Sequence, residues 1–319
     1  MRISAVLVAL ALAASGCGAS GSPPPAAAGT PAPPTTPAPT TVSAPPSPTR
    51  TPSPKPSPAV APTTVAPRPS ATTSRPAAPA PPPPVTTNRR CDTPPAASTG
   101  GYGRTITPSA PLDLLVTGDS LQESMGPQLT GYANAKKKSV AGCTVPKYST
   151  GLVRDDFFDW PAYAKELSAS RDPEAVSFMI GGNDAQNMSV GGRILEAGSA
   201  EWAAEYQRRA AAVMSAFARP SRRVYWIGMP IARSERHTRV FKVANAAVKK
   251  AAAGVSGVQY VDIWAMFAPN GVYQDSFADE YGRVQRMRSS DGIHLSTAGA
   301  GYLARRMLKT LDADWHLTT

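Results

Sequence analysis

Three short segments, far apart in the sequence, hold residue types that together could carry out nucleophilic chemistry. Segment 118–121 (Gly-Asp-Ser-Leu) supplies a hydroxyl, and segment 181–184 (Gly-Gly-Asn-Asp) supplies an amide. Segment 291–294 (Asp-Gly-Ile-His) supplies a carboxylate and an imidazole three residues apart. A serine hydroxyl becomes a nucleophile when a histidine accepts its proton, and a carboxylate can hold that imidazole in the required tautomer. The three segments therefore predict a serine-based acyl chemistry.

Ser120, His294 and Asp291 are the predicted catalytic residues. Ser120 lies between an apolar run and a helical pattern, so it could instead act only as a helix cap. The other two histidines, His237 and His316, are interpreted as satisfied surface or core residues. His294 differs from them because Asp291 can fold back to its Nδ1 and leave Nε2 free to take the serine proton.

Asn183 is the predicted oxyanion donor, because its amide can donate a hydrogen bond without carrying charge. The glycines before it, Gly182 among them, allow a tight turn and close approach of a substrate. An ordinary Gly-Gly-Asn-Asp turn is the competing interpretation. We expect Asp119 to brace the turn beside the nucleophile by hydrogen bonds.

Apolar runs alternate with helical patterns along the last two thirds of the chain. The predicted strands are Leu112–Thr117, Ala175–Ile180, Arg223–Gly228 and Val258–Trp264. The predicted helices are Leu121–Tyr132, Trp160–Ala169, Ala200–Ala218, Val240–Ala252 and Thr297–Leu311. This alternation predicts an α/β fold, with a parallel sheet covered on both faces and ligands at the carboxyl ends of its strands.

The N-terminal part of the chain differs in composition from the rest. Of the 35 prolines in the chain, 24 lie before residue 91, and the first acidic residue is Asp92. Seven basic residues there account for most of the net charge of +11, leaving +4 for the remainder. Residues 18–90 are rich in Pro, Ala, Thr and Ser and cannot bury enough apolar surface to fold, which predicts a disordered, extended tether. Its basic charge indicates a solvated segment or one that contacts anionic envelope polymers.

Residues 1–17 have the pattern of an export signal. Arg2 is followed by an apolar run too short to span a bilayer, and the segment ends Ala-Ser-Gly-Cys at Cys17. Small residues before a cysteine resemble the bacterial lipoprotein box, in which Cys17 would be lipidated. We therefore expect an exported protein held at the cell membrane through Cys17 and facing the cell wall. Simple secretion is the alternative.

Two further cysteines, Cys91 and Cys143, remain if Cys17 carries lipid. In an exported chain such a pair predicts a disulfide, here joining the start of the domain 91–319 to its body. Neither cysteine has a partner at metal-ligand spacing, and we expect no metal.

The three segments, in this order, resemble the first, third and fifth blocks of the SGNH (GDSL-type) hydrolase superfamily. The resemblance covers about residues 112–311. It implies a three-layer α/β/α sandwich with a mostly parallel, flavodoxin-like sheet, and ester hydrolysis or acyl transfer without a cofactor. It also implies an oxyanion hole formed by the Ser120 N–H, the Gly151 N–H and the Asn183 amide. Segment 157–161 (Phe-Phe-Asp-Trp-Pro) is similar to the envelope branch associated with polysaccharide acetyl groups.

An envelope-anchored esterase removing O-acetyl groups from glycans is the function we expect. A glycan O-acetyltransferase, a lipid or lysophospholipid esterase and a non-catalytic wall-binding protein are the alternatives. The chain lacks interleaved aromatic and basic residues, so no nucleic acid partner is expected, and we expect a monomer. Arg286 and Arg288 are interpreted either as contacts to an anionic substrate or as part of a solvated basic face.

Overall fold

A sheet of five parallel strands forms the centre of the protein. The computed structural model describes Cys91 and residues 101–318. The strands follow the order β2-β1-β3-β6-β7. Their bounds are β1 Leu112–Gly118, β2 Val140–Pro146, β3 Ala175–Met179, β6 Arg223–Ile227 and β7 Val258–Val261. Every strand pairs in parallel with its neighbours, so all five carboxyl ends share one rim of the sheet.

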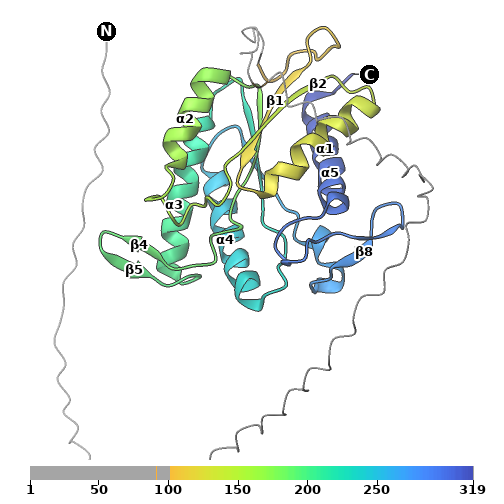
Figure 1. Ribbon diagram of the computed structural model, residues 1–319. Coiled ribbons are helices and arrows are strands. Elements are labelled where there is room, and N and C mark those ends of the chain that lie inside the picture. Colours follow the sequence, from red (N-terminus) through yellow and green to blue (C-terminus); the bar gives the residue numbers. More distant parts are fainter. Residues whose placement is uncertain (1–90, 92–100, 319) are drawn as a thin grey trace, which may run out of the picture. The chain divides into compact units, whose positions relative to one another are not determined.

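Helices cover both faces of this sheet (Figure 1). One face carries α1 Leu121–Ala135 and α5 Thr297–Trp315, and the other carries α2 Trp160–Arg171, α3 Ala200–Phe217 and α4 Glu235–Ala253. Two 3-10 turns, Ala265–Phe267 and Pro269–Gly271, follow β7. The three-layer α/β/α sandwich predicted from the sequence is confirmed.

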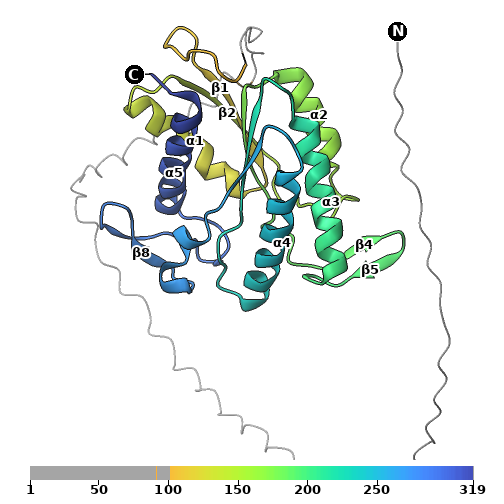
Figure 2. The same cartoon turned by 180° about the vertical axis from the view of Figure 1, so that it is seen from behind.

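Two short antiparallel hairpins stand beside the rim where the central strands end. The first pairs β4 Met188–Val190 with β5 Arg193–Leu195, and the second pairs β8 Ser276–Ala278 with β9 Val284–Arg286. Figures 1 and 2 show them at the same end of the molecule, on opposite sides of the sheet. They extend the rim at which a substrate would meet the sheet.

Aromatic side chains pack the face covered by α2, α3 and α4. The Phe178 ring on β3 lies 5.1 Å from that of Trp160 and 4.5 Å from that of Trp226, and all three are buried. Burial of such side chains contributes about 1.5–3 kcal/mol each to folding. Trp160 opens α2, and the Asp159 carboxylate caps that helix by accepting the Ala162 N–H at 2.9 Å.

Strand β2 is the one central strand that the sequence pattern did not predict. Its residues Val-Ala-Gly-Cys-Thr-Val-Pro are mostly small and include Gly142 and a final Pro146. Glycine and proline weaken a strand pattern, but both are tolerated at the edge of a sheet, where β2 lies. The other predicted elements occur with shifted ends; α4, for example, begins at Glu235 rather than Val240.

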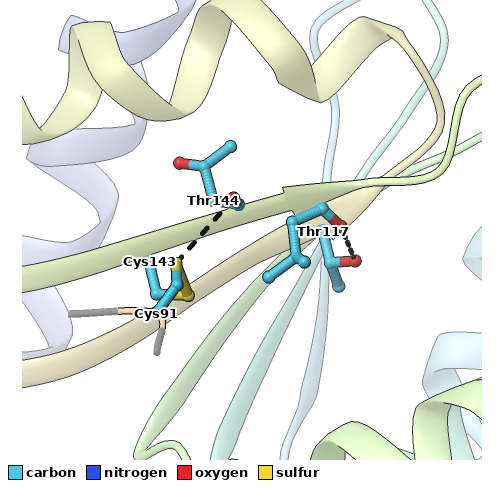
Figure 3. Close-up of a disulfide and its surroundings, with 5 residues drawn as sticks. Cys91, Thr117, Cys143 and Thr144 are labelled. Atoms are coloured by element: carbon cyan, nitrogen blue, oxygen red, sulfur yellow. Dashed lines mark hydrogen bonds between the residues drawn. A yellow bond between two sulfur atoms is a disulfide. The ribbon is translucent and has the colours of Figure 1, made fainter. Parts of the chain in front are cut away.

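The disulfide between Cys91 and Cys143 is present, with 5.2 Å between the two Cα atoms (Figure 3). It attaches the start of the described domain to β2. The other N-terminal predictions, lipidated Cys17, signal segment 1–17 and tether 18–90, lie outside the described residues. Among the helices that are described, none combines the length and the apolar character needed to cross a bilayer.

Asp113, at the start of β1, is a partly buried acid beside a second carboxylate. Its backbone N–H donates to Glu174 Oε2 at 3.0 Å, while Arg104 pairs with the Glu174 carboxylate. Its own Oδ2 has no hydrogen-bond partner within the described residues. Burial, and then the charge of Glu174, raise the pKa of Asp113 from 3.8 to about 6. Asp113 therefore favours folding below about pH 4, and this contribution is lost as the pH rises through about 6.

We predict that Asp113→Asn stabilises the protein at pH 8 and not at pH 4. The uncharged amide avoids the cost of burying a carboxylate beside Glu174, which should raise the free energy of unfolding by about 1–2 kcal/mol at pH 8. Urea unfolding at both pH values measures the difference. Glu174→Ala is the control with the opposite sign, because it removes the carboxylate that pairs with Arg104 and accepts the Asp113 N–H. An equal change at both pH values would show that ionisation of Asp113 is not the cause.

Candidate active site

Ser120 lies two residues after the end of β1, at the position preceding α1. Its side chain makes no capping hydrogen bond to the helix, so the helix-cap interpretation does not describe it. The Oγ atom instead lies 2.7 Å from Nε2 of His294, a residue 174 positions later in the chain. Ser120 thus has the partner that a nucleophilic serine requires.

His294 and Asp291 form the second half of the same hydrogen-bond chain. The His294 Nδ1 atom lies 2.6 Å from Asp291 Oδ2. The other oxygen, Oδ1, accepts the N–H groups of Ile293 at 2.8 Å and His294 at 2.9 Å. A carboxylate on Nδ1 assigns the ring proton to that nitrogen and leaves Nε2 as the acceptor facing Ser120.

Asp291 keeps its charge at neutral pH. Burial acts to raise its pKa, but the hydrogen bonds from the Ile293 N–H, the His294 ring and the His294 N–H together hold the pKa below its ordinary value. An ionised Asp291 can stabilise the imidazolium that forms when His294 takes a proton. The arrangement can therefore move a proton from Ser120 Oγ to His294 Nε2.

Asp119 ties the serine turn to the end of β3. Its fully buried carboxylate accepts the Leu121 N–H on Oδ1, and the Gly181 and Gly182 N–H groups on Oδ2, each at 2.9 Å. Burial raises its pKa to about 6, against the pull of these three donors. The preceding Gly118 has φ +139°, and a Cβ there would lie 1.9 Å from the Met179 carbonyl oxygen. Two strand ends thereby meet closely beside the nucleophile.

Asp184 ties the end of β3 to the loop after β2, and sequence analysis gave it no role. Its buried carboxylate accepts the N–H groups of Leu152 at 2.9 Å and Val153 at 3.1 Å and the Tyr206 hydroxyl at 2.8 Å. A Cβ on Gly151 would lie 2.0 Å from Asp184 Oδ1, so only glycine fits there. Its position in the sequence, directly after Gly-Gly-Asn at the end of a buried strand, was the feature from which this structural role could have been predicted.

The predicted oxyanion donors come from three adjacent strand ends. Asn183 Nδ2 donates to the Thr150 carbonyl at 2.8 Å, which fixes the amide and leaves its second N–H. The backbone N–H groups of Ser120 and Gly151 donate to no protein acceptor within residues 101–318. Trp160 Nε1 donates to Thr150 Oγ1 at 3.1 Å and so supports the same loop.

Arg288 contradicts both interpretations made from the sequence. Its side chain is fully buried, and its guanidinium donates to the carbonyls of Gly292 at 3.2 Å and Ile293 at 2.7 Å, and to that of Ile231. Burial lowers its pKa to about 10. Arg288 thus holds the loop that carries His294 and cannot meet a substrate, whereas Arg286 is exposed.

A cavity of about 280 Å³ opens beside the hydrogen-bond chain. Its lining comes from the start of α1 and from the loop before α5: Ser120, Leu121, Glu123, Ser124, Ser289, Asp291, His294 and Leu295. The other two histidines lie elsewhere, His237 in the first turn of α4 and His316 at the end of α5. Among the described residues, no group of His, Cys, Asp and Glu side chains has the arrangement of a metal site.

We predict that Asp184→Asn lowers kcat about 10- to 100-fold with little change in KM, since a displaced Gly151 loop misplaces an oxyanion donor. Tyr206→Phe removes only one of the three donors to Asp184 and should give a smaller loss. Kinetics on 4-nitrophenyl acetate and thermal unfolding of both variants measure this. A change in KM alone, or full activity in Asp184→Asn, would contradict the positioning role.

Comparison with known proteins places the chain in a family and finds solved structures of low similarity. No curated protein matches the sequence. LAE5, an alpha/beta hydrolase from the metagenome of Lake Arreo, is 16% identical, with a TM-score of 0.47 over 65% of this chain and 96% of that one. An acetyl xylan esterase from Geobacillus stearothermophilus is 18% identical, with a TM-score of 0.44 over 66% and 95%.

A carbohydrate esterase family 3 protein from Talaromyces cellulolyticus is 15% identical, with a TM-score of 0.41 over 63% of this chain and 97% of that one. At this level of similarity the likeness does not extend to activity or substrate.

The family match is direct, because the model of a family described as "Protein of unknown function (DUF459)" matches residues 113–310. The chain belongs to the DUF459 family.

Proposed function

We propose that this protein is a serine ester hydrolase of the SGNH type. The observation that carries the proposal is the unbroken hydrogen-bond chain from Ser120 Oγ through His294 to Asp291, with distances of 2.7 and 2.6 Å. Each member comes from a segment whose residue types suit its role, and Asp291 is held as an anion. A chance contact between a serine and a histidine would not require this third residue.

The proposed reaction begins when Ser120 Oγ attacks the carbonyl carbon of an ester while His294 Nε2 takes the hydroxyl proton. The N–H groups of Ser120 and Gly151 and the Asn183 amide stabilise the negative oxygen that forms. His294 then gives its proton to the departing alcohol, which leaves an acyl group on Ser120. Water attacks this acyl-enzyme with His294 again as base, and the acid and the free serine are released.

The exposure of the base favours hydrolysis over acyl transfer. The side chains of His294 and Asp291 are 39% and 46% exposed, so water reaches the point at which the acyl-enzyme would be attacked. A transferase must keep water away from that bond until the acceptor binds. A non-catalytic binding protein is disfavoured because it has no use for the Ser120–His294 contact.

Small acyl groups on glycans are the substrates that we propose. The cavity beside Ser120 has a volume of only about 280 Å³, and Glu123, Ser124 and Ser289 make part of its lining polar. A long acyl chain would need an extended apolar groove. An O-acetyl group fits the small volume, and the rest of a polysaccharide can remain outside it. We infer, accordingly, an O-acetyl esterase acting on envelope or environmental glycans.

We predict that Ser120→Ala lowers kcat on 4-nitrophenyl acetate at least about a thousandfold while the thermal unfolding temperature stays near that of the wild type. Ser124→Ala is the matched control, because Ser124 lines the same cavity one helical turn later. It should keep nearly full activity. Activity retained in Ser120→Ala would remove the mechanism.

Acetyl, butyryl and octanoyl esters in the same assay test the acyl group. Activity should fall with chain length, and a preference for octanoyl would point to a lipid esterase instead. An acetylated glycan, with a second glycan as acceptor, separates release of acetate from transfer.

The proposed setting is the outer side of a cell membrane, with the enzyme anchored through a lipid on Cys17. Acyl chains in the bilayer contribute about 0.8 kcal/mol per buried CH₂, so several chains on one cysteine hold a protein stably. A tether over residues 18–90 at ~3.1 Å per residue would let the domain act on the order of 200 Å away.

We predict that Cys17→Ser moves the full chain from the membrane fraction to the soluble fraction of the producing cells. Cys91→Ser, which also replaces one cysteine but leaves Cys17, should remain with the membrane. Immunoblots of fractionated cells show the distribution. Membrane retention of Cys17→Ser would exclude lipid anchoring at this residue and favour an uncleaved signal or another contact.

A further inference from the structure

A second and larger cavity, of about 640 Å³, lies between the β4–β5 hairpin and α4. Figures 1 and 2 show this hairpin near the end of α4 that lies at the rim where the central strands end. The β5 strand and the residues flanking the hairpin contribute Asn187, Ile194, Glu196, Ala197 and Gly198, and α4 contributes Arg236, Arg239, Val240 and Val243. Its volume falls within the range of about 300–1,000 Å³ that small-molecule sites occupy.

Hydrogen bonds connect the segments that flank this cavity to the segments of the proposed catalytic site. On one side, Asn187 follows Asn183 by four residues, and Gln186 Nε2 between them donates to the Asn183 carbonyl at 2.7 Å. On the other side, the Arg233 N–H donates at 3.1 Å to the carbonyl of Gly292, in the loop that carries His294. A ligand in this cavity would therefore lie along the same rim as an ester bound at Ser120.

The net charge of the cavity lining is positive. Arg236 and Arg239 lie on the exposed side of α4, and neither makes an ion pair or side-chain hydrogen bond within residues 101–318. Two other arginines nearby are occupied, because Arg193 pairs with Glu201 at 3.1 Å and Arg233 pairs with Asp275 at 2.6 Å. Glu196 is the one acid in the lining, so the two arginines outweigh it.

We propose that this cavity binds an acidic sugar of the acylated glycan through a carboxylate held by Arg236 and Arg239. This inference rests on the proposed function and names its substrate class, a polysaccharide that carries both O-acetyl esters and carboxylates. A guanidinium offers paired N–H donors that match the two oxygens of a carboxylate. Two arginines one helical turn apart can hold one such group or two neighbouring ones.

The remaining lining suits a sugar ring. The side chains of Val240 and Val243 form an apolar wall on α4, and Ile194 on the hairpin is 67% exposed. The C–H faces of a pyranose can pack on these side chains, while Asn187 and Glu196 can meet its hydroxyl groups. A free inorganic anion would use only the arginines, so the cavity favours an anionic saccharide.

Direct binding tests the proposal without relying on catalysis. The full chain carrying Ser120→Ala is titrated by calorimetry with galacturonic acid oligomers, and with malto-oligosaccharides of equal length as the neutral comparison. The acidic oligomers should bind, the neutral ones at least about tenfold more weakly, and added salt should reduce the difference. Arg236→Gln with Arg239→Gln should weaken binding of the acidic oligomer about 10- to 100-fold. Equal binding of acidic and neutral oligomers, or no binding of either, would overturn the proposal.

A matched control separates a local contact from the total charge. Lys249→Gln with Lys250→Gln makes the same change in net charge on exposed positions at the far end of α4. It should leave binding of the acidic oligomer within about twofold of the parent. An equal loss in both double variants would reduce the effect to general electrostatics and overturn the site.

Kinetics on 4-nitrophenyl acetate distinguish this proposal from the proposed function. With Ser120 restored, the Arg236→Gln, Arg239→Gln variant should hydrolyse this neutral ester as fast as the wild type, and show about a tenfold higher KM on an acetylated galacturonan. An inactive wild type would contradict the esterase while leaving the binding result to decide the site. Loss of activity on the neutral ester in the arginine variant would instead mean that these residues support the catalytic loops.

Discussion

The buried carboxylate of Asp119 is the interaction on which the geometry of the site depends. It lies in the turn that presents Ser120, yet two of its three hydrogen bonds go to the backbone after β3. Those bonds hold the segment leading to Asn183 against the nucleophile. Asp184 repeats the arrangement one loop further along, since its carboxylate holds the segment that follows Gly151. The predicted oxyanion donors are thus positioned by two acids that are themselves buried.

Burying a charged carboxylate costs free energy, and hydrogen bonds from the backbone N–H groups of the surrounding loops offset part of that cost. Burial raises the pKa of both Asp119 and Asp184. The loops after parallel strands, however, have backbone N–H groups that would otherwise remain unsatisfied. A carboxylate that accepts several of them offsets part of its desolvation and fixes the loops at the same time. Preorganisation of this kind lets fixed donors stabilise charge without rearranging during the reaction.

The residue types along the chain were sufficient to predict the layers of the fold. They also predicted that Ser120, Asp291 and His294 lie together at one rim of the sheet. They were not sufficient where tertiary contacts decide the outcome. Edge strand β2 was not predicted because its small residues, its glycine and its proline do not form the apolar pattern of a strand. Arg288 was misread because an arginine near a predicted site suggests solvent or substrate, whereas here it is fully buried among loop carbonyls. Nothing local distinguishes a buried arginine from an exposed one.

The two sides of the site differ in their exposure to solvent, and this difference affects the chemistry that the site can carry out. On the side of the predicted oxyanion donors, Asp119 and Asp184 are buried and accept backbone N–H groups of the loops there. On the base side, His294 and Asp291 are open to solvent, and the loop that carries them is held from beneath by Arg288. In the function proposed above, a small acyl group would enter the confined side while a long glycan would lie across the open rim toward α4. Chemistry at Ser120 and recognition of a polymer can then vary independently, because they use different loops of one sheet edge.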